Sequence, residues 1–128
     1  MFIFFDIEIV LLLSVFEQKL FLRQVIYYKN FEKLFYRWMS PETLISNTQF
    51  SSKSDVWSFG VLIWELFTYS TQYTPLPYSH LKDEEVLVNI LRGQVLSCPQ
   101  KCPKDLFCLM QKCWIRNILQ RPTFKVCL

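Results

Sequence analysis

Residues 54–66, SDVWSFGVLIWEL, have the pattern of one long helix. Ser54 is a typical helix cap, and Asp55 places an acid in the first turn, where the free amides of a helix start favour negative charge. The segment is apolar at positions 56, 57, 59, 61–64, 66 and 67, so no polar face remains. The pattern therefore predicts a central helix that is buried on all sides. Gly60 costs about 1 kcal/mol relative to Ala within a helix, which indicates that another element packs closely against it.

Shorter helices are expected before and after this one. Residues 40–42 supply a Ser cap, a proline at the first helical position and an acid in the first turn, so a short helix should begin there and end near Ile45. After a loop rich in Ser, Thr and Pro, residues 83–93 begin with acids and end at Gly93, as expected of a helix. The side of this helix that should face the core consists of Val86, Leu87, Ile90 and Leu91.

A fourth helix is expected over residues 102–114, with Pro103 near its start. The side chains predicted to point inward are those of Leu106, Phe107, Met110 and Trp114. Thr123 could cap a fifth helix, but the few residues after it are too short for a helix that is stable in water. We therefore expect the fold to continue beyond this sequence.

Composition and charge exclude several classes of protein. The chain has 128 residues, enough for one domain at most or for part of a larger one. With 52% hydrophobic and 17% aromatic residues, it can build a core and is too apolar to be disordered. Its net charge is +3 and its basic residues are scattered, so we expect no nucleic-acid partner.

Five cysteines stand at positions 98, 102, 108, 113 and 127. An odd count without a C-x-x-C pair indicates neither a zinc ribbon nor a disulfide framework. We therefore expect a reducing compartment. Cys108 and Cys113 fall on the expected fourth helix, where we interpret them as buried thiols that behave as small hydrophobic side chains.

The first residues, 1–26, are rich in apolar side chains but fit no targeting signal. The uncharged stretch 9–16 is eight residues long, against the roughly 20 that a spanning helix needs, so no membrane span is expected. A signal peptide begins with basic residues, whereas two acids precede the first basic residue here, Lys19. The alternation of apolar and acidic residues over 5–9 is typical of a strand. We assign this leader no function.

Five motifs occur in an order that is typical of one family. They are RWMSPE (37–42), SDVWSFGVLIWEL (54–66), PY (77–78), CW (113–114) and RPTF (121–124). Together they resemble the carboxy-terminal lobe of a protein tyrosine kinase. The resemblance implies a mainly α fold, the helical C-lobe of the protein-kinase fold, which is incomplete here and follows an amino-terminal segment of uncertain structure.

By this resemblance, residues 27–128 form part of a protein-tyrosine-kinase catalytic domain, from the end of the activation segment through the C-lobe helices. Tyr27 and Tyr28 resemble the paired activation-loop tyrosines of receptor-type members and are expected phosphorylation sites. Residues 18–24, QKLFLRQ, resemble the residues that follow an Asp-Phe-Gly motif. Residues 1–26 are then either a remnant that precedes the activation segment or an artefact of gene prediction, such as a translated intron.

The resemblance also implies roles for individual residues. Glu42 and Arg121 match two residues that form a structural ion pair. Asp55 matches an aspartate that bonds backbone groups of the catalytic loop and anchors this loop on the central helix. The substrate-positioning loop matches Arg37, Trp38, Met39 and Ser40, of which the last stands where the family often has Ala. The core of the lobe is expected at Trp57, Trp64 and Trp114.

The motifs that bind ATP and support phosphoryl transfer are missing. The chain has two glycines, Gly60 and Gly93, which excludes a Gly-x-Gly-x-x-Gly loop, and neither of them follows Asp-Phe. Its single histidine, His80, is followed by Leu81 and Lys82, which excludes His-Arg-Asp. We therefore expect no catalytic residue and no metal ligand in this chain. ATP and magnesium are expected only in the complete parent domain.

These observations predict a fragment of a tyrosine kinase domain that is inactive by itself. The parent family transfers the γ-phosphoryl group of ATP to a tyrosine of a protein or peptide substrate, in the cytoplasm or in the cytoplasmic part of a membrane receptor. The alternative is a non-catalytic, pseudokinase-like module that binds other proteins. The helix expected over 83–93 resembles a surface on which kinases dock partners, although a solvated acidic helix start would have the same sequence.

Overall fold

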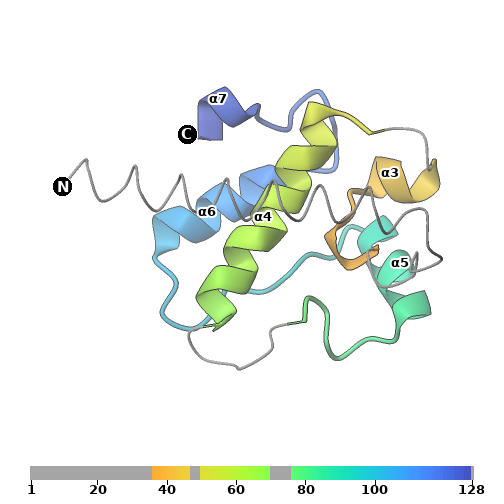
Figure 1. The fold of residues 1–128 in the computed structure, drawn as a ribbon, viewed down its shortest axis with the longest axis horizontal. Coiled ribbons are helices and arrows are strands. Elements are labelled where there is room, and N and C mark those ends of the chain that lie inside the picture. The colour runs from red at the N-terminus through yellow and green to blue at the C-terminus, as the bar shows by residue number, and fades with distance from the viewer. Residues whose placement is uncertain (1–35, 47–49, 70–75, 128) are drawn as a thin grey trace. The chain divides into compact units, whose positions relative to one another are not determined.

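The computed structural model describes residues 36–46, 50–69 and 76–127. The strand expected over 5–9, the leader 1–26 and the two tyrosines at 27 and 28 lie outside these residues. All regular elements within the described part are helices (Figure 1), which confirms the predicted fold class. The elements are η1 (Tyr36–Trp38), α3 (Pro41–Ile45), α4 (Ser52–Tyr69), α5 (Asp83–Leu91), α6 (Lys104–Cys113) and α7 (Phe124–Cys127).

Helix α4 is the long helix expected at the centre, and both α6 and η1 pack against it (Figure 1). Its buried apolar side chains are Val56, Trp57, Phe59, Val61, Leu62 and Ile63. The prediction of burial on all sides is wrong for the last part of the helix, where Leu66 is 42% exposed and Trp64 and Phe67 are half-buried. An apolar pattern does not indicate how far along a helix its covering neighbours extend.

Helix α4 begins earlier than predicted. Ser51, and not Ser54, is the capping residue: the Ser54 amide donates to Ser51 Oγ at 3.2 Å, and the Ser51 amide donates to Ser54 Oγ at 2.8 Å. The two serines thus satisfy one another's amides reciprocally, as the residues of a capping box do. The stretch offers serines at 51, 52 and 54, and only the backbone geometry decides which of them caps the helix.

Gly60 marks the place where α6 meets α4, as predicted. A Cβ atom at this position would lie 2.7 Å from Cys113 Cβ and 2.8 Å from Trp114 Nε1. Contacts this short do not occur between real side chains, so only glycine allows α6 to approach this closely.

The shorter helices also agree with the sequence. Helix α3 starts with Pro41 and ends at Ile45, as predicted. Ser40 stands at the cap position, but its side chain makes no capping hydrogen bond, so the prediction of a serine cap is wrong. Helix α5 ends at Leu91, and Gly93 beyond it has a φ of +84°, which glycine adopts without strain. The inward side chains of α5 and α6 include Val86, Ile90 and Met110, and these are buried, as is Trp114 directly after α6.

The prediction that Cys108 is buried is wrong, because this residue lies on the exposed side of α6 while Cys113 lies on the buried side. Leu106 and Phe107, which were expected to point inward, are half-buried. No helix among the described residues is both long enough and apolar enough to cross a membrane.

Candidate functional site

The candidate site is the segment Arg37–Glu42, the RWMSPE motif, which runs from η1 into α3. Three groups of contacts fasten it to parts of the chain that are distant in sequence. They join it to the turn before α5, to α4, and to Arg121 just before α7.

Arg37 fastens the segment to the turn before α5. Its Nη1 donates to the carbonyls of Pro77 and Tyr78, both at 2.8 Å, and its Nη2 donates to Leu81 O at 3.0 Å and to Asp83 Oδ1 at 2.7 Å. Tyr78 has a φ of +56°, a left-handed backbone that is unfavourable for a bulky residue and that these bonds stabilise. Arg37 is only 4% exposed, so its side chain holds the turn in place and does not face solvent.

Two polar contacts fasten the segment to α4. Trp38 Nε1 donates to Glu65 Oε2 at 2.9 Å, and Ser58 Oγ donates to the Trp38 carbonyl at 2.8 Å. Met39 follows with a buried side chain. The backbone of the segment is therefore attached to α4 by a hydroxyl of that helix.

Ser40 is the residue that the resemblance places where the family often has Ala. Its hydroxyl lies 2.8 Å from the hydroxyl of Thr43, and both residues are buried. The extra polar atom therefore has a partner within α3, so its burial is compensated.

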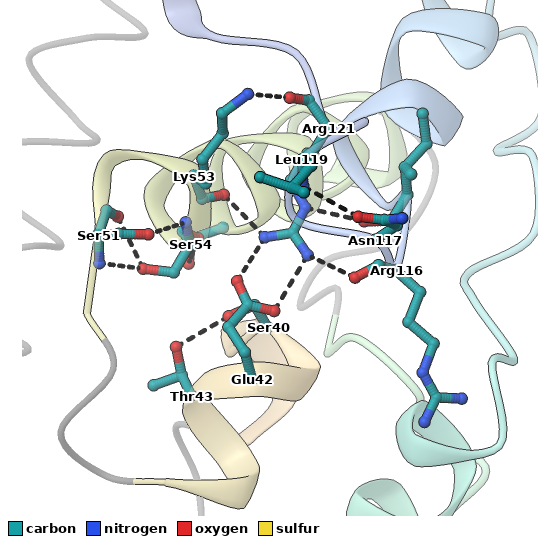
Figure 2. A network of polar contacts seen from close by, with 12 residues as sticks. Ser40, Glu42, Thr43, Ser51, Lys53, Ser54, Arg116, Asn117, Leu119 and Arg121 are labelled. Carbon is teal, nitrogen blue, oxygen red and sulfur yellow. Dashed lines mark hydrogen bonds and ion pairs between the residues drawn. The ribbon is translucent and has the colours of Figure 1, made fainter.

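Glu42 and Arg121 are joined by two parallel hydrogen bonds (Figure 2). Arg121 Nη1 donates to Glu42 Oε1 at 2.6 Å, and Nη2 donates to Oε2 at 3.0 Å. The exposed fraction of the side chain is 0% for Arg121 and 9% for Glu42. A planar guanidinium fits a carboxylate with two bonds, which makes this arrangement more specific than a single contact.

Arg121 also contacts three backbone carbonyls and an aromatic ring. It donates to Ile115 O and Lys53 O, each at 2.9 Å, and to Arg116 O at 3.5 Å. Its guanidinium carbon lies 5.2 Å from the ring centre of Trp57, a cation–π distance. The Lys53 ammonium in turn donates to the carbonyl of Arg121 (Figure 2). One side chain thus connects α3, the start of α4 and residues 115–121.

The surroundings of Glu42 have opposing effects on its acidity. Burial by itself raises the pKa of Glu42. The hydrogen bonds from Arg121, a backbone hydrogen bond at Glu42 and the positive charge of Arg121 together outweigh burial, with a smaller contribution from Ser40. The net result is a pKa below the ordinary value of a glutamate, so Glu42 is ionised at neutral pH.

The remaining residues singled out by the sequence lie in different environments. Asp55 is half-buried in the first turn of α4, and its role as an anchor of the catalytic loop stays a prediction. Trp57 and Trp114 are buried in the core. Trp64 is only half-buried, and its indole Nε1 donates to Ser97 O at 2.9 Å, so it fastens the connection between α5 and α6 to α4.

The described residues do not fit ATP and magnesium. Within 36–46, 50–69 and 76–127, no three His, Cys, Asp or Glu side chains are placed to share a metal ion. The sequence also has no glycine-rich loop for the phosphates.

Three contact residues of the site, Ser58, Glu65 and Asp83, were not identified from the sequence. Ser58 could have been identified from the sequence, because a hydroxyl within a buried helix requires a hydrogen-bond partner. Asp83 was interpreted only as an acid at a helix start. Glu65 lies within α4, and no local sequence pattern links it to Trp38. Their pairing follows only from the way the helix packs.

Comparison with known proteins matches residues 18–128 to the family described as protein tyrosine and serine/threonine kinase. A putative molluscan insulin-related peptide receptor from Lymnaea stagnalis is 46% identical over 89 residues, which are 70% of this chain and 5% of the relative. The tyrosine-protein kinase SYK of Gallus gallus is 46% identical over 88 residues, 69% of this chain and 14% of the relative. The inactive tyrosine-protein kinase 7 of Mus musculus is 46% identical over 89 residues, 69% of this chain and 8% of the relative. The chain thus spans only a small part of each relative.

Proposed function

The chain belongs to the protein tyrosine and serine/threonine kinase family, and from this premise we propose that residues 37–42 position the substrate in a tyrosine kinase domain. The domain as a whole would transfer the γ-phosphoryl group of ATP to a tyrosine of a protein or peptide. The family generally uses ATP and magnesium. Residues 27–128 would supply the end of the activation segment and the helical part of the lobe, and the leader 1–26 keeps no assigned function.

The observation that carries this proposal is the threefold attachment of the segment. Arg37 is bonded to the turn before α5, the Trp38 carbonyl to Ser58 of α4, and Glu42 to Arg121. A loop that presents a peptide for phosphoryl transfer must hold its geometry closely, since small displacements of the acceptor slow the reaction. Buried charge-assisted bonds supply that rigidity without contact to the substrate. Arg37 and Glu42 would therefore act as positioning residues.

A chimera tests the proposal directly. Residues 36–127 of this chain replace the aligned stretch of chicken SYK, which supplies the missing motifs, and phosphorylation of a tyrosine peptide is measured with ATP and magnesium. We expect kcat/KM within about tenfold of the host, equivalent to about 1.4 kcal/mol of activation free energy. Changing Glu42→Gln in the chimera should lower kcat/KM further, and changing the host's own catalytic aspartate should abolish transfer. A folded chimera that binds ATP without phosphorylating tyrosine would refute the proposal.

The alternative function is a non-catalytic module that binds other proteins. It is favoured by the 46% identity to a mouse relative whose name describes it as inactive. Sequencing the 5′ end of the transcript separates the two functions. An in-frame His-Arg-Asp and Asp-Phe-Gly upstream of residue 18 would support the kinase, and a full transcript without them would support the module.

A location within the cytoplasm, or in the cytoplasmic part of a receptor, follows only from the proposed function. The relatives of this chain include both a receptor and a protein named simply as a tyrosine-protein kinase. Tyr27 and Tyr28 remain proposed phosphorylation sites, where added negative charge would pair with basic residues and order the activation segment.

A further inference from the structure

The connection between α5 and α6 carries two cysteines on either side of a tight turn. The amide of Cys102 donates to the carbonyl of Pro99 at 3.2 Å, which closes a four-residue turn. Cys98 immediately precedes the turn and Cys102 ends it. Lys101 within the turn has a φ of +63°, a left-handed conformation that is unfavourable for a lysine. The folded chain therefore holds the two cysteines together despite local backbone strain.

The thiols of Cys98 and Cys102 lie close enough for Cys98 to influence the acidity of Cys102. Each sulfur also lies near the carbonyl of the proline that follows it, Cys98 Sγ at 3.6 Å from Pro99 O and Cys102 Sγ at 3.5 Å from Pro103 O. Cys98 is exposed, whereas Cys102 is half-buried. A soluble reagent can thus reach Cys98 more easily than Cys102.

We propose that Cys98 and Cys102 form a modification site at which a hydroperoxide reversibly oxidises the dithiol to an intramolecular disulfide. The Cys98 thiolate attacks one oxygen of hydrogen peroxide, which breaks the O–O bond and yields a sulfenic acid, and the released hydroxide takes up a proton to become water. The Cys102 sulfur then attacks the Cys98 sulfur, and its proton leaves with the hydroxyl group as a second water molecule. Two thiols are oxidised and one peroxide is reduced.

The environment assigns different roles to the two sulfurs. Burial, together with the charge and hydrogen bonding of Cys98, raises the pKa of Cys102. Cys102 therefore stays protonated at neutral pH and is the resolving thiol, while the exposed Cys98 meets the oxidant. In a reducing compartment such a disulfide is transient, as expected of a redox-sensitive site.

The second close pair of thiols is less suited to this chemistry. Cys113 and Cys127 also interact, but Cys113 is fully buried and burial raises its pKa strongly. The thiolate is the reactive form, so a buried thiol of raised pKa reacts slowly. Cys108 is exposed on α6 and serves as a control thiol of similar accessibility.

The experiment treats the full reduced chain with hydrogen peroxide, blocks the remaining thiols with an alkylating reagent and digests the product with trypsin without reduction. Trypsin cleaves after Lys101, so a Cys98–Cys102 disulfide joins two peptides, 93–101 and 102–104, that reduction separates. We expect this linked pair to be the main product, at a rate that does not depend on protein concentration, and thioredoxin to reverse it. Cys108→Ser should leave its yield unchanged.

Two further measurements make the test decisive. Cys102→Ser should abolish the linked pair and leave Cys98 as a sulfenic acid that dimedone traps. Concentrated urea should slow the linkage in the wild-type chain, because the turn that aligns the sulfurs is lost. Equal rates with and without urea, linkage mainly to Cys108, Cys113 or Cys127, or faster oxidation of Cys108 than of Cys98 would each overturn the proposal.

Discussion

Arg121 shows how a buried charge can be compatible with a stable fold. Its side chain is removed from water, and desolvation of an ion pair often costs more than its Coulomb attraction returns. Here the Glu42 carboxylate takes two of its donors, and the carbonyls of Ile115, Lys53 and Arg116 accept from it as well. The guanidinium is therefore satisfied around its whole edge, which is the condition under which such a pair is tolerated.

A double-mutant cycle tests this pair. Glu42→Gln strands the guanidinium and Arg121→Leu strands the carboxylate, so each change should lower the free energy of unfolding by about 3–5 kcal/mol. The double variant should cost much less than the sum, because it leaves neither charge unpaired. Urea unfolding measures all four proteins. The matched control Arg116→Leu alters an exposed side chain and should cost no more than about 0.5 kcal/mol. Additive effects below about 1 kcal/mol would contradict the pairing.

The lowered pKa of Glu42 predicts a dependence of stability on pH. In the unfolded chain a glutamate titrates at about pH 4.3. Because the folded pKa lies below this value, folding favours the ionised form, and the stabilisation is fully present above the unfolded pKa and lost as the pH falls through the folded pKa. Unfolding by urea between neutral pH and about pH 3 should show this loss. Glu42→Gln should remove that part of the dependence, and an identical pH profile for both proteins would disprove it.

At the scale of elements, the junction of α4 and α6 depends on one missing side chain. Alanine in place of Gly60 would ordinarily stabilise a helix by about 1 kcal/mol. Here its Cβ would lie 2.7 Å from Cys113 Cβ, an atom fixed to the α6 backbone. We expect Gly60→Ala to destabilise the chain by about 1–3 kcal/mol, since the two helices must move apart. Thermal or urea unfolding shows whether the substitution lowers or raises the free energy of unfolding. An unchanged or raised stability would contradict the close packing.

A second glycine gives a matched comparison. A Cβ on Gly93 would have no neighbour within 4 Å, but its φ of +84° is unfavourable for alanine. Gly93→Ala should therefore cost about 1–2 kcal/mol through backbone strain alone. Gly93→Asn should recover part of this loss, because asparagine tolerates the left-handed region. No such rescue is expected for Gly60→Asn, and equal behaviour at the two sites would contradict the distinction.

The elements also show what the sequence could predict. The start of α3 could be predicted from Pro41 and the acid after it, and the end of α5 from Gly93, because these signals act within a few residues of one another. Ser40 stands at the cap position but makes no capping hydrogen bond. The start of α4 was misplaced, since neighbouring serines offered several caps of equal quality. No sequence pattern predicts the four oxygen atoms that accept from Arg37. Three of them are backbone carbonyls, which every residue carries, and the fourth belongs to Asp83. The pairing of Glu42 with Arg121 was expected only from family resemblance, as no local pattern links residues 79 apart.

At the scale of the whole molecule, residues 36–127 pack as one compact unit, which lies within the stretch that matches the kinase family. This unit connects the RWMSPE segment to α4, to the turn before α5 and to Arg121 through buried polar contacts. We propose that this segment positions a substrate, while the residues for phosphate and metal binding are missing from the sequence. A measurement of ATP binding should therefore distinguish this chain from a complete kinase domain.

We expect that the isolated chain neither binds ATP nor phosphorylates tyrosine. Kinases hold the nucleotide through glycine-rich backbone amides, a lysine and magnesium bound by acidic and amide side chains. The two glycines of this chain are 33 positions apart, and neither His-Arg-Asp nor Asp-Phe-Gly occurs. A ligand at 100 times its Kd would stabilise the folded state by about 2.7 kcal/mol, an effect that a melting experiment detects easily. The melting temperature should stay constant up to millimolar ATP with magnesium, while the kinase domain of chicken SYK, as positive control, should be stabilised. A rise in the melting temperature of the chain, or labelled phosphate on a tyrosine peptide, would show that it binds the nucleotide through residues that the family does not use.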